Sequence, residues 1–184
     1  MHEELSQKQA VDLCFPVGKF SWEGEISDDL RRHFIAEIEV APANLRAAVK
    51  GLSEEQLGTP YRPDGWTIRQ VAHHLPDSHL NAYTRFKLAL TEDDPLIKTY
   101  DQDRWAQLAD SRSVPIEVSL TLLEALHHRW GVLLRSLTAQ DYARTFRHPE
   151  LGVVSLDRNL GLYAWHGRHH VAHITSVRKR MGWD

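Results

Sequence analysis

The sequence predicts an all-α protein, a four-helix bundle that forms one domain over residues 1–184. Two observations favour this class. Four long stretches carry apolar residues three and four positions apart, a spacing that places them on one face of an α-helix. The chain has 184 residues, 42% of them hydrophobic, which is enough to bury one core without disulfide bonds. Because each amphipathic helix must cover its apolar face, four of them are expected to pack into a bundle.

The first 27 residues are expected to be irregular, because proline and glycine residues interrupt them. The first long helix is predicted to begin after Ser27, an N-cap residue type that is followed by two aspartates. Gly51 is expected to end this helix, and Pro42 is expected to kink it.

The second long helix is predicted to run from Thr67 to about Leu90. Thr67 and Gln70 have the spacing of a capping box, in which each side chain binds the backbone N–H of the other residue. Pro76 lies inside this helix. We therefore expect a bend there and a carbonyl group at Ala72 that has lost its helical partner.

The rest of the chain is predicted to hold two more long helices and their connections. Residues 91–114, which are rich in Asp and include Pro95 and Tyr100, are expected to form a long loop. The third helix is predicted over residues 115–137, because Pro115 suits a first turn and the strongest apolar pattern of the chain follows it. Short alternating runs within 142–154 predict a small hairpin. The fourth helix is predicted over residues 156–181.

Composition excludes several classes of function. A net charge of −3 gives no basic surface for nucleic acid. The one cysteine, Cys14, allows no internal disulfide and is interpreted as an inert residue of a protein in the reducing cytoplasm. The N-terminal residues lack the pattern of a signal peptide, and no stretch is apolar enough for a membrane helix. We therefore expect a cytoplasmic protein with no membrane partner.

Histidine is the unusual residue type of this chain, which contains twelve of them. Two clusters fall in the second and fourth predicted helices. The first comprises His73, His74 and His79, and the second comprises His166, His169, His170 and His173. Neutral imidazoles from two packed helices can hold a transition metal and leave a coordination position open. The clusters therefore predict a metal site.

Helix phase selects three of these histidines as ligands. At about 100° per residue, His170 lies roughly 60° and His166 roughly 100° from the centre of the apolar stripe on the fourth helix. The two are four residues apart, so their rings stand one turn apart on the same flank. On the second helix His74 lies roughly 110° from the stripe centre. The predicted metal ligands are therefore His74, His166 and His170.

The other histidines are not expected to hold this ion. His169 and His173 have a more solvent-facing phase, His73 points away from the apolar stripe, and His79 falls on it. The remaining ones are interpreted as surface, loop or incidental residues: His2, His33, His127, His128 and His148. A histidine on a helix flank is often only a surface or hydrogen-bonded residue, so the pattern alone leaves that alternative open.

Other catalytic motifs are missing from the sequence. It contains no His-Glu-x-x-His motif, no Gly-x-Ser-x-Gly elbow and no glycine-rich phosphate loop. Glu124 and His127 have the Glu-x-x-His spacing of di-iron bundles, but the second copy that such sites need does not occur. The acidic residues at 93–94 and 101–103 are interpreted as solvated loop residues.

Three stretches carry a resemblance to a known family. They are residues 64–92, which begin Asp-Gly-Trp-Thr-Ile-Arg-Gln-Val-Ala-His-His-Leu, residues 160–183, and the run Phe-Pro-Val-Gly-Lys-Phe at 15–20. In these stretches, and over nearly its whole length, the chain resembles the YfiT-type branch of the DinB-like superfamily. Pro76 stands where the family pattern leads us to expect alanine.

The resemblance implies a four-helix bundle, a homodimer and a metal-dependent hydrolase with a three-histidine site. The family's ligand positions match His74, His166 and His170. One divalent ion per subunit is expected, with zinc as the first choice and nickel as the alternative. Related bundles transfer low-molecular-weight thiols such as bacillithiol to electrophiles, so thiol transfer is the second activity that the resemblance implies.

Three functions therefore stay open for a small-molecule substrate. They are a hydrolase whose ion activates water, a thiol S-transferase whose ion binds a thiolate, and a non-enzymatic bundle with a structural ion. Asp77, one turn from His74, is the catalytic candidate because it can orient the His74 ring, although an exposed helix acid is the plainer interpretation. The candidates for a cationic rim that holds an acidic thiol are Arg69, Arg85 and Arg168.

Overall fold

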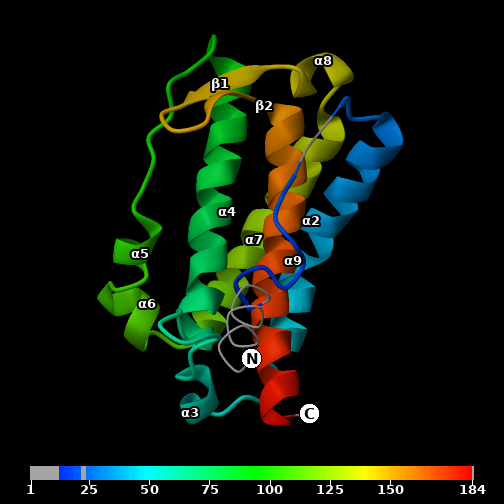
Figure 1. The fold of residues 1–184 in the computed structure, drawn as a ribbon. Helices are drawn as coiled ribbons and strands as arrows, with labels where there is room; N and C mark the ends of the chain where they lie inside the picture. The colour runs from blue at the N-terminus through cyan, green and yellow to red at the C-terminus, as the bar shows by residue number, and fades with distance from the viewer. Residues whose placement is uncertain (1–12, 22–23, 184) are drawn as a thin grey trace, which may run out of the picture.

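The protein is a bundle of four long helices, shown by a computed structural model that describes residues 13–21 and 24–183 (Figure 1). Within these residues the helices longer than twenty residues are α2 (Asp28–Val49), α4 (Ile68–Thr91), α7 (Ile116–Ser136) and α9 (Leu156–Met181). Helix α2 packs on α7 and α9, and α4 packs on the same two helices. The predicted fold class is therefore confirmed.

The starts of the long helices follow the capping residues of the sequence. The Ser27 hydroxyl accepts a hydrogen bond from the Leu30 N–H at the start of α2. At the start of α4 the predicted capping box is present: Thr67 accepts from the Gln70 N–H, and the Gln70 side chain accepts from the Thr67 N–H. Pro115 is the N-cap of α7, one residue before the first turn.

The two helix prolines do not interrupt their helices. Helix α2 continues through Pro42, and α4 continues through Pro76; both prolines are buried. Tertiary packing therefore outweighs the hydrogen bond that each proline removes from its helix. As a result α4 stays continuous from His74 to His79.

The connections contain more structure than the sequence pattern predicts. Residues 91–114, expected to be a loop, include α5 (Gln102–Trp105) and α6 (Ala109–Ser113). Two further short helices, α3 (Glu54–Leu57) and α8 (Ala139–Tyr142), lie in other connections. Helices of four or five residues are too short to show an apolar period, so the loop prediction is wrong at these places.

The predicted hairpin is confirmed. Strands β1 (Thr145–His148) and β2 (Gly152–Ser155) pair antiparallel, with Thr145 opposite Ser155. The hairpin lies across one end of the bundle (Figure 1), and Ser155 at its end is the N-cap of α9.

The N-terminal segment is irregular over residues 15–21 and 24–27, as expected, whereas residues 13–14 are helical, unlike the expectation. Residues 1–12 and 22–23 lie outside the described part.

Two apolar clusters make up the interior. The cluster nearer the hairpin includes Phe86, Trp130 and Phe146, and the other cluster includes Leu75 and Ile174. On α9 the histidines fall in sequence between Ala164 of the first cluster and Ile174 of the second, and on α4 His79 falls between Leu75 and Ala82. No helix of the described chain is both long and apolar enough to span a bilayer.

Candidate metal centre

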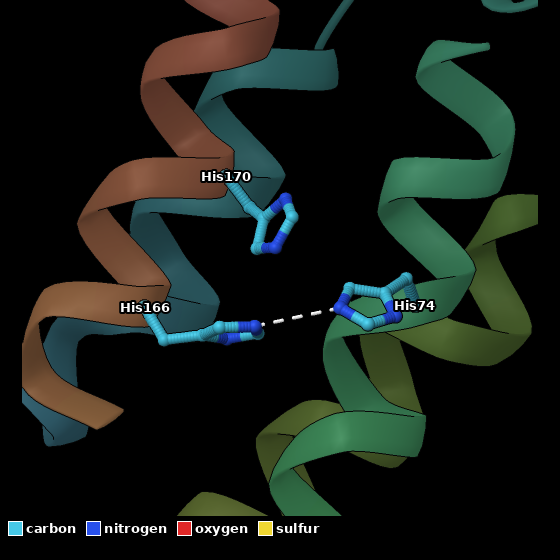
Figure 2. Close-up of side chains that lie close together, drawn as sticks. All are labelled: His74, His166 and His170. Carbon is cyan, nitrogen blue, oxygen red and sulfur yellow. Dashed lines mark hydrogen bonds between the residues drawn. The ribbon is translucent and has the colours of Figure 1, made fainter. Parts of the chain in front are cut away.

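The structure brings the three predicted ligands together from two helices. His74 lies on α4, and His166 and His170 lie one turn apart on α9, with their rings directed into the space between the helices (Figure 2). The Nε2 atoms of His74 and His166 are 3.4 Å apart. One ring nitrogen from each of the three residues lies within 4.8 Å of the others.

This spacing fits a tetrahedral divalent ion. Two nitrogen ligands that each lie about 2.0–2.1 Å from Zn²⁺ at tetrahedral corners are about 3.3–3.4 Å from one another. The distance of 3.4 Å between the Nε2 atoms of His74 and His166 agrees with that value. His170 places a third ring nitrogen within 4.8 Å of the other two, so the donor set that is present suits such an ion.

All three rings are neutral at physiological pH. Burial lowers the pKa of His74 to about 3, and it lowers the pKa of His166 and His170 well below the usual 6.5, with a smaller contribution from neighbouring histidines. A neutral ring keeps a lone pair free for a metal. The three candidate ligands include no carboxylate. A divalent ion bound to them would therefore keep its full positive charge and stay a strong electrophile.

The indole ring of Trp66 covers the metal centre from outside the bundle. Its centroid lies 4.6 Å from that of His74 and 6.4 Å from that of His170, and it stacks nearly parallel to the His170 ring. The indole N–H donates to the Asp103 carboxylate, which fixes the ring in this position. Trp66 directly precedes the N-cap of α4, so the same segment starts the helix and shields the site.

His169 and His173, expected to face solvent, are buried. The His173 ring stacks on Tyr61 with centroids 4.0 Å apart, and its Nε2 lies 3.3 Å from the Cys14 carbonyl oxygen. The His169 ring stacks on Trp165. The helix wheel predicts which side of α9 meets the other long helices, but it carries no information on the segments that cover the outer side.

Two other histidines were also placed wrongly by the sequence. His73 is buried and lies within hydrogen-bond distance of the Ser119 hydroxyl and the Val114 carbonyl. His127, interpreted as incidental, is 2% exposed. It contacts His79, which is fully buried as its place on the apolar stripe indicates.

Two clefts meet at His166. The larger, of about 600 Å³, also contains His170 and Trp66. The smaller, of about 400 Å³, contains Arg85 and Tyr100. Burial raises the pKa of the Tyr100 hydroxyl to about 12, so this group remains a hydrogen-bond donor. The centre is therefore reachable by a small molecule from two sides.

Only one of the three predicted rim arginines lies at these clefts. Arg85 lines the smaller cleft. Arg69 instead pairs with Glu54 and donates to a backbone carbonyl, and Arg168 pairs with Glu37. Arg62, which sequence reasoning missed, lines the larger cleft and contacts Tyr61. It lies in a connecting loop that carries no helical period, so no pattern could have indicated it.

Asp77 shows no direct link to the metal centre. Burial raises the pKa of its carboxyl group to about 6. Within residues 13–21 and 24–183, however, no hydrogen bond joins this carboxylate to the ring of His74, although the two residues are three positions apart on α4. The expectation that Asp77 orients His74 is therefore not supported by a contact.

Comparison with known proteins places this chain in a family. The model of the DinB superfamily matches residues 37–174. A Bacillus cereus protein named "Putative metal-dependent hydrolase" is 54% identical over 172 residues, which cover 94% of this chain and 99% of the relative. A protein of the same description from Oceanobacillus iheyensis is 54% identical over 169 residues, or 92% of this chain and 98% of the relative.

Solved structures agree with this placement. YfiT from Bacillus subtilis, described as "a probable metal-dependent hydrolase with an unusual four-helix bundle topology", superposes with a TM-score of 0.92 at 47% identity, covering 94% of this chain and 99% of that one. A second four-helix bundle protein, 21% identical, has a TM-score of 0.55 over 79% of this chain and supports the fold alone. Taken with the family match and the close relatives, these likenesses show that the chain belongs to the DinB superfamily.

Proposed function

We propose that this protein is a metal-dependent hydrolase in which His74, His166 and His170 hold one divalent ion, zinc first and nickel as the alternative. One observation carries the proposal: three neutral ring nitrogens converge within 4.8 Å of one another where two clefts meet, and the pair from His74 and His166 has the spacing of two tetrahedral ligands. Open catalytic zinc sites also use three protein ligands. The names of the relatives in Bacillus cereus and Oceanobacillus iheyensis support the same activity.

The residues of the chain would bind and orient a substrate beside the ion. When bound, such an ion polarises a carbonyl group and lowers the pKa of a water molecule toward neutrality. Trp66 would exclude bulk water from one side of the centre, because its ring packs against both His74 and His170. The Tyr100 hydroxyl in the smaller cleft would donate a hydrogen bond to a polar substrate group. Asp77 has no role in this proposal.

Thiol transfer is the second candidate, and Arg85 is the observation that favours it. Arg85 is only 8% exposed, yet it lines the cleft that ends at His166. A buried guanidinium at that place would hold a carboxylate, which acidic thiols such as bacillithiol carry. In this reaction the thiol would lose its proton to solvent, its sulfur would bond to an electrophilic carbon, and the leaving group would depart with the electron pair of the broken bond. A bound metal would lower the pKa of the thiol, so the reaction would need no general base from the protein.

A substrate panel on the zinc-loaded protein separates the two activities. Ester and amide substrates are supplied without a thiol, and cysteine, glutathione or bacillithiol is supplied with a chlorobimane as the electrophile. Hydrolysis predicts product release from esters or amides, whereas transfer predicts a fluorescent conjugate and an equal loss of free thiol. His166→Ala serves as the control that lacks a proposed ligand.

Each outcome of the panel decides between the candidates. Turnover of esters or amides with no thiol consumed would exclude transfer. Conjugation without any hydrolysis would exclude the hydrolase. If neither reaction exceeds the rate of the His166→Ala variant, the bundle is to be treated as a non-enzymatic metal-binding protein for these substrate classes.

We also propose that the protein forms a homodimer, as its family resemblance implies. Helix α7 supports this, because it carries exposed apolar side chains on one flank. Val118 is 58% exposed, Leu122 is 46% exposed and Val132 is 65% exposed. Apolar residues on an outward helix flank are suited to contact a second copy.

A further inference from the structure

A chain of buried histidines leads from the metal centre to a backbone carbonyl on α2. His166 Nδ1 lies 3.1 Å from His79 Nε2. His79 Nδ1 lies 2.8 Å from His127 Nε2, and His127 Nδ1 lies 2.5 Å from the Ile38 carbonyl oxygen. These residues come from α9, α4, α7 and α2, so the chain of contacts crosses the whole bundle.

The carbonyl at the end of this chain fixes the direction of every hydrogen bond in it. A carbonyl oxygen only accepts, so His127 Nδ1 must carry a proton and donate to Ile38. In a neutral ring the other nitrogen is then an acceptor, so His127 Nε2 accepts from His79 Nδ1–H. By the same step, His79 Nε2 accepts from His166 Nδ1–H. The lone pair of His166 is therefore on Nε2, the atom that faces His74.

The argument requires neutral rings, and the surroundings favour them. His79 is fully buried and His127 is 2% exposed. The His79 ring lies edge-on to Trp130 and to Tyr163, at centroid distances of 5.9 and 5.2 Å, and the His127 ring lies edge-on to the same tryptophan. A charged imidazolium would be costly in such an apolar enclosure, so both rings are expected to be neutral.

We propose that His79 and His127 are positioning residues that set the tautomer of His166 and hold its Nε2 atom free for the metal ion. This inference rests on the proposed function, because it takes His166 as a ligand. Histidine ligands commonly donate their second ring N–H to an outer partner, and loss of that partner typically weakens metal binding about 10–100-fold. Here the outer partner is a relay of two further rings, anchored on the Ile38 carbonyl.

Two substitutions at His79 test this role. In His79→Gln the side-chain carbonyl can still accept the proton of His166 Nδ1, whereas His79→Leu has a similar size and no acceptor. We expect His79→Leu to weaken zinc binding about 10–100-fold, measured by competition with a chelator. His79→Gln should stay within a few-fold of the wild type. Equal affinities for the wild type and His79→Leu would overturn the proposal.

A second readout needs no metal and no activity. Long-range ¹H–¹⁵N correlation spectra of the metal-free protein show which ring nitrogen carries the proton. We expect His166 as the Nδ1–H tautomer in the wild type and in His79→Gln, and a shift toward Nε2–H in His79→Leu. A wild-type spectrum with the His166 proton on Nε2 would overturn the proposal even if His79→Leu failed to fold.

The two readouts keep this inference distinct from the proposed function. If the wild-type protein binds no zinc but shows His166 as the Nδ1–H tautomer, the proposed function fails and the tautomer assignment stands. If zinc binds and His166→Ala abolishes it while His79→Leu changes neither affinity nor tautomer, the ligand role stands and the positioning role fails.

Discussion

At the level of single residues, the structure offers two overlapping histidine groups that could hold the proposed ion. His170 belongs to both: one group joins it to His74 and His166, and the other joins it to His169 and His173. The first group links two helices and lies where the clefts meet. In the second group the three Nδ1 atoms are buried without hydrogen-bond partners among the described residues, so these nitrogens offer the ion a competing set of donors.

Single alanine substitutions distinguish the two groups. We expect His74→Ala and His166→Ala to lose stoichiometric zinc, because two imidazoles that remain do not retain an ion through dialysis. His169→Ala is the matched control on the same helix and should retain one ion per chain. Metal content is measured by mass spectrometry of the dialysed proteins. Loss of the ion in His169→Ala together with its retention in His74→Ala would assign the ion to the second group.

Helix phase predicted the three residues that the structure brings together, because it shows which residues lie on the flank beside the apolar stripe of each helix. It did not predict the burial of His173 or His127. His173 is covered by Tyr61 and by the backbone at Cys14, both far from it in sequence. His127 is held by a carbonyl group of α2. Such contacts depend on tertiary placement, which a single helical wheel does not contain.

At the level of elements, α9 approaches α2 closely at Gly167. A Cβ atom at this position would lie 3.2 Å from the Cβ of Ala41 and 3.8 Å from His79. The close approach therefore depends on the missing side chain. Gly131 on α7 offers a contrast, because a Cβ there would meet the flexible side chain of Glu39.

Alanine at the two glycines should therefore have different effects on stability. Gly131→Ala is expected to raise the free energy of unfolding by up to about 1 kcal/mol, because alanine favours the helix and Glu39 can move. Gly167→Ala should lack this gain, and Gly167→Leu should lower the free energy of unfolding by about 1–3 kcal/mol through overpacking. Urea denaturation measures all three. A Gly167→Leu variant as stable as the wild type would show that α9 and α2 can separate freely.

The long elements were predictable and the short ones were not. Apolar periodicity over about twenty residues, together with caps such as Ser27 and Thr67, was sufficient for the four long helices and their starts. Helix α5 has a cap at Asp101 but only four residues, none of them buried, so it carries no apolar pattern. Helix α4 runs through Pro76 without interruption, and the bend expected at this proline stays a prediction.

At the level of the whole molecule, the proposed dimer is tested by mass in solution. We expect light scattering to give twice the chain mass of 21.2 kDa. Leu122→Arg should shift the protein toward the monomer if the exposed flank of α7 forms the contact, because a charge at an apolar contact is costly to bury. A wild-type protein that scatters as a monomer at every concentration would contradict the proposal. If the Leu122→Arg variant remains a dimer, the dimer contact does not lie on this flank of α7.

The layer of histidines between the two apolar clusters has a mechanical consequence. The histidine rings there are polar groups that lie beside aromatic side chains such as Trp130. In the proposed function, an ion held by His74, His166 and His170 would join α4 to α9 and act as a cross-link between these two helices. A substitution that empties the centre would then remove this tie together with the proposed chemistry, so the cohesion of the bundle and its activity would draw on the same few nitrogen atoms.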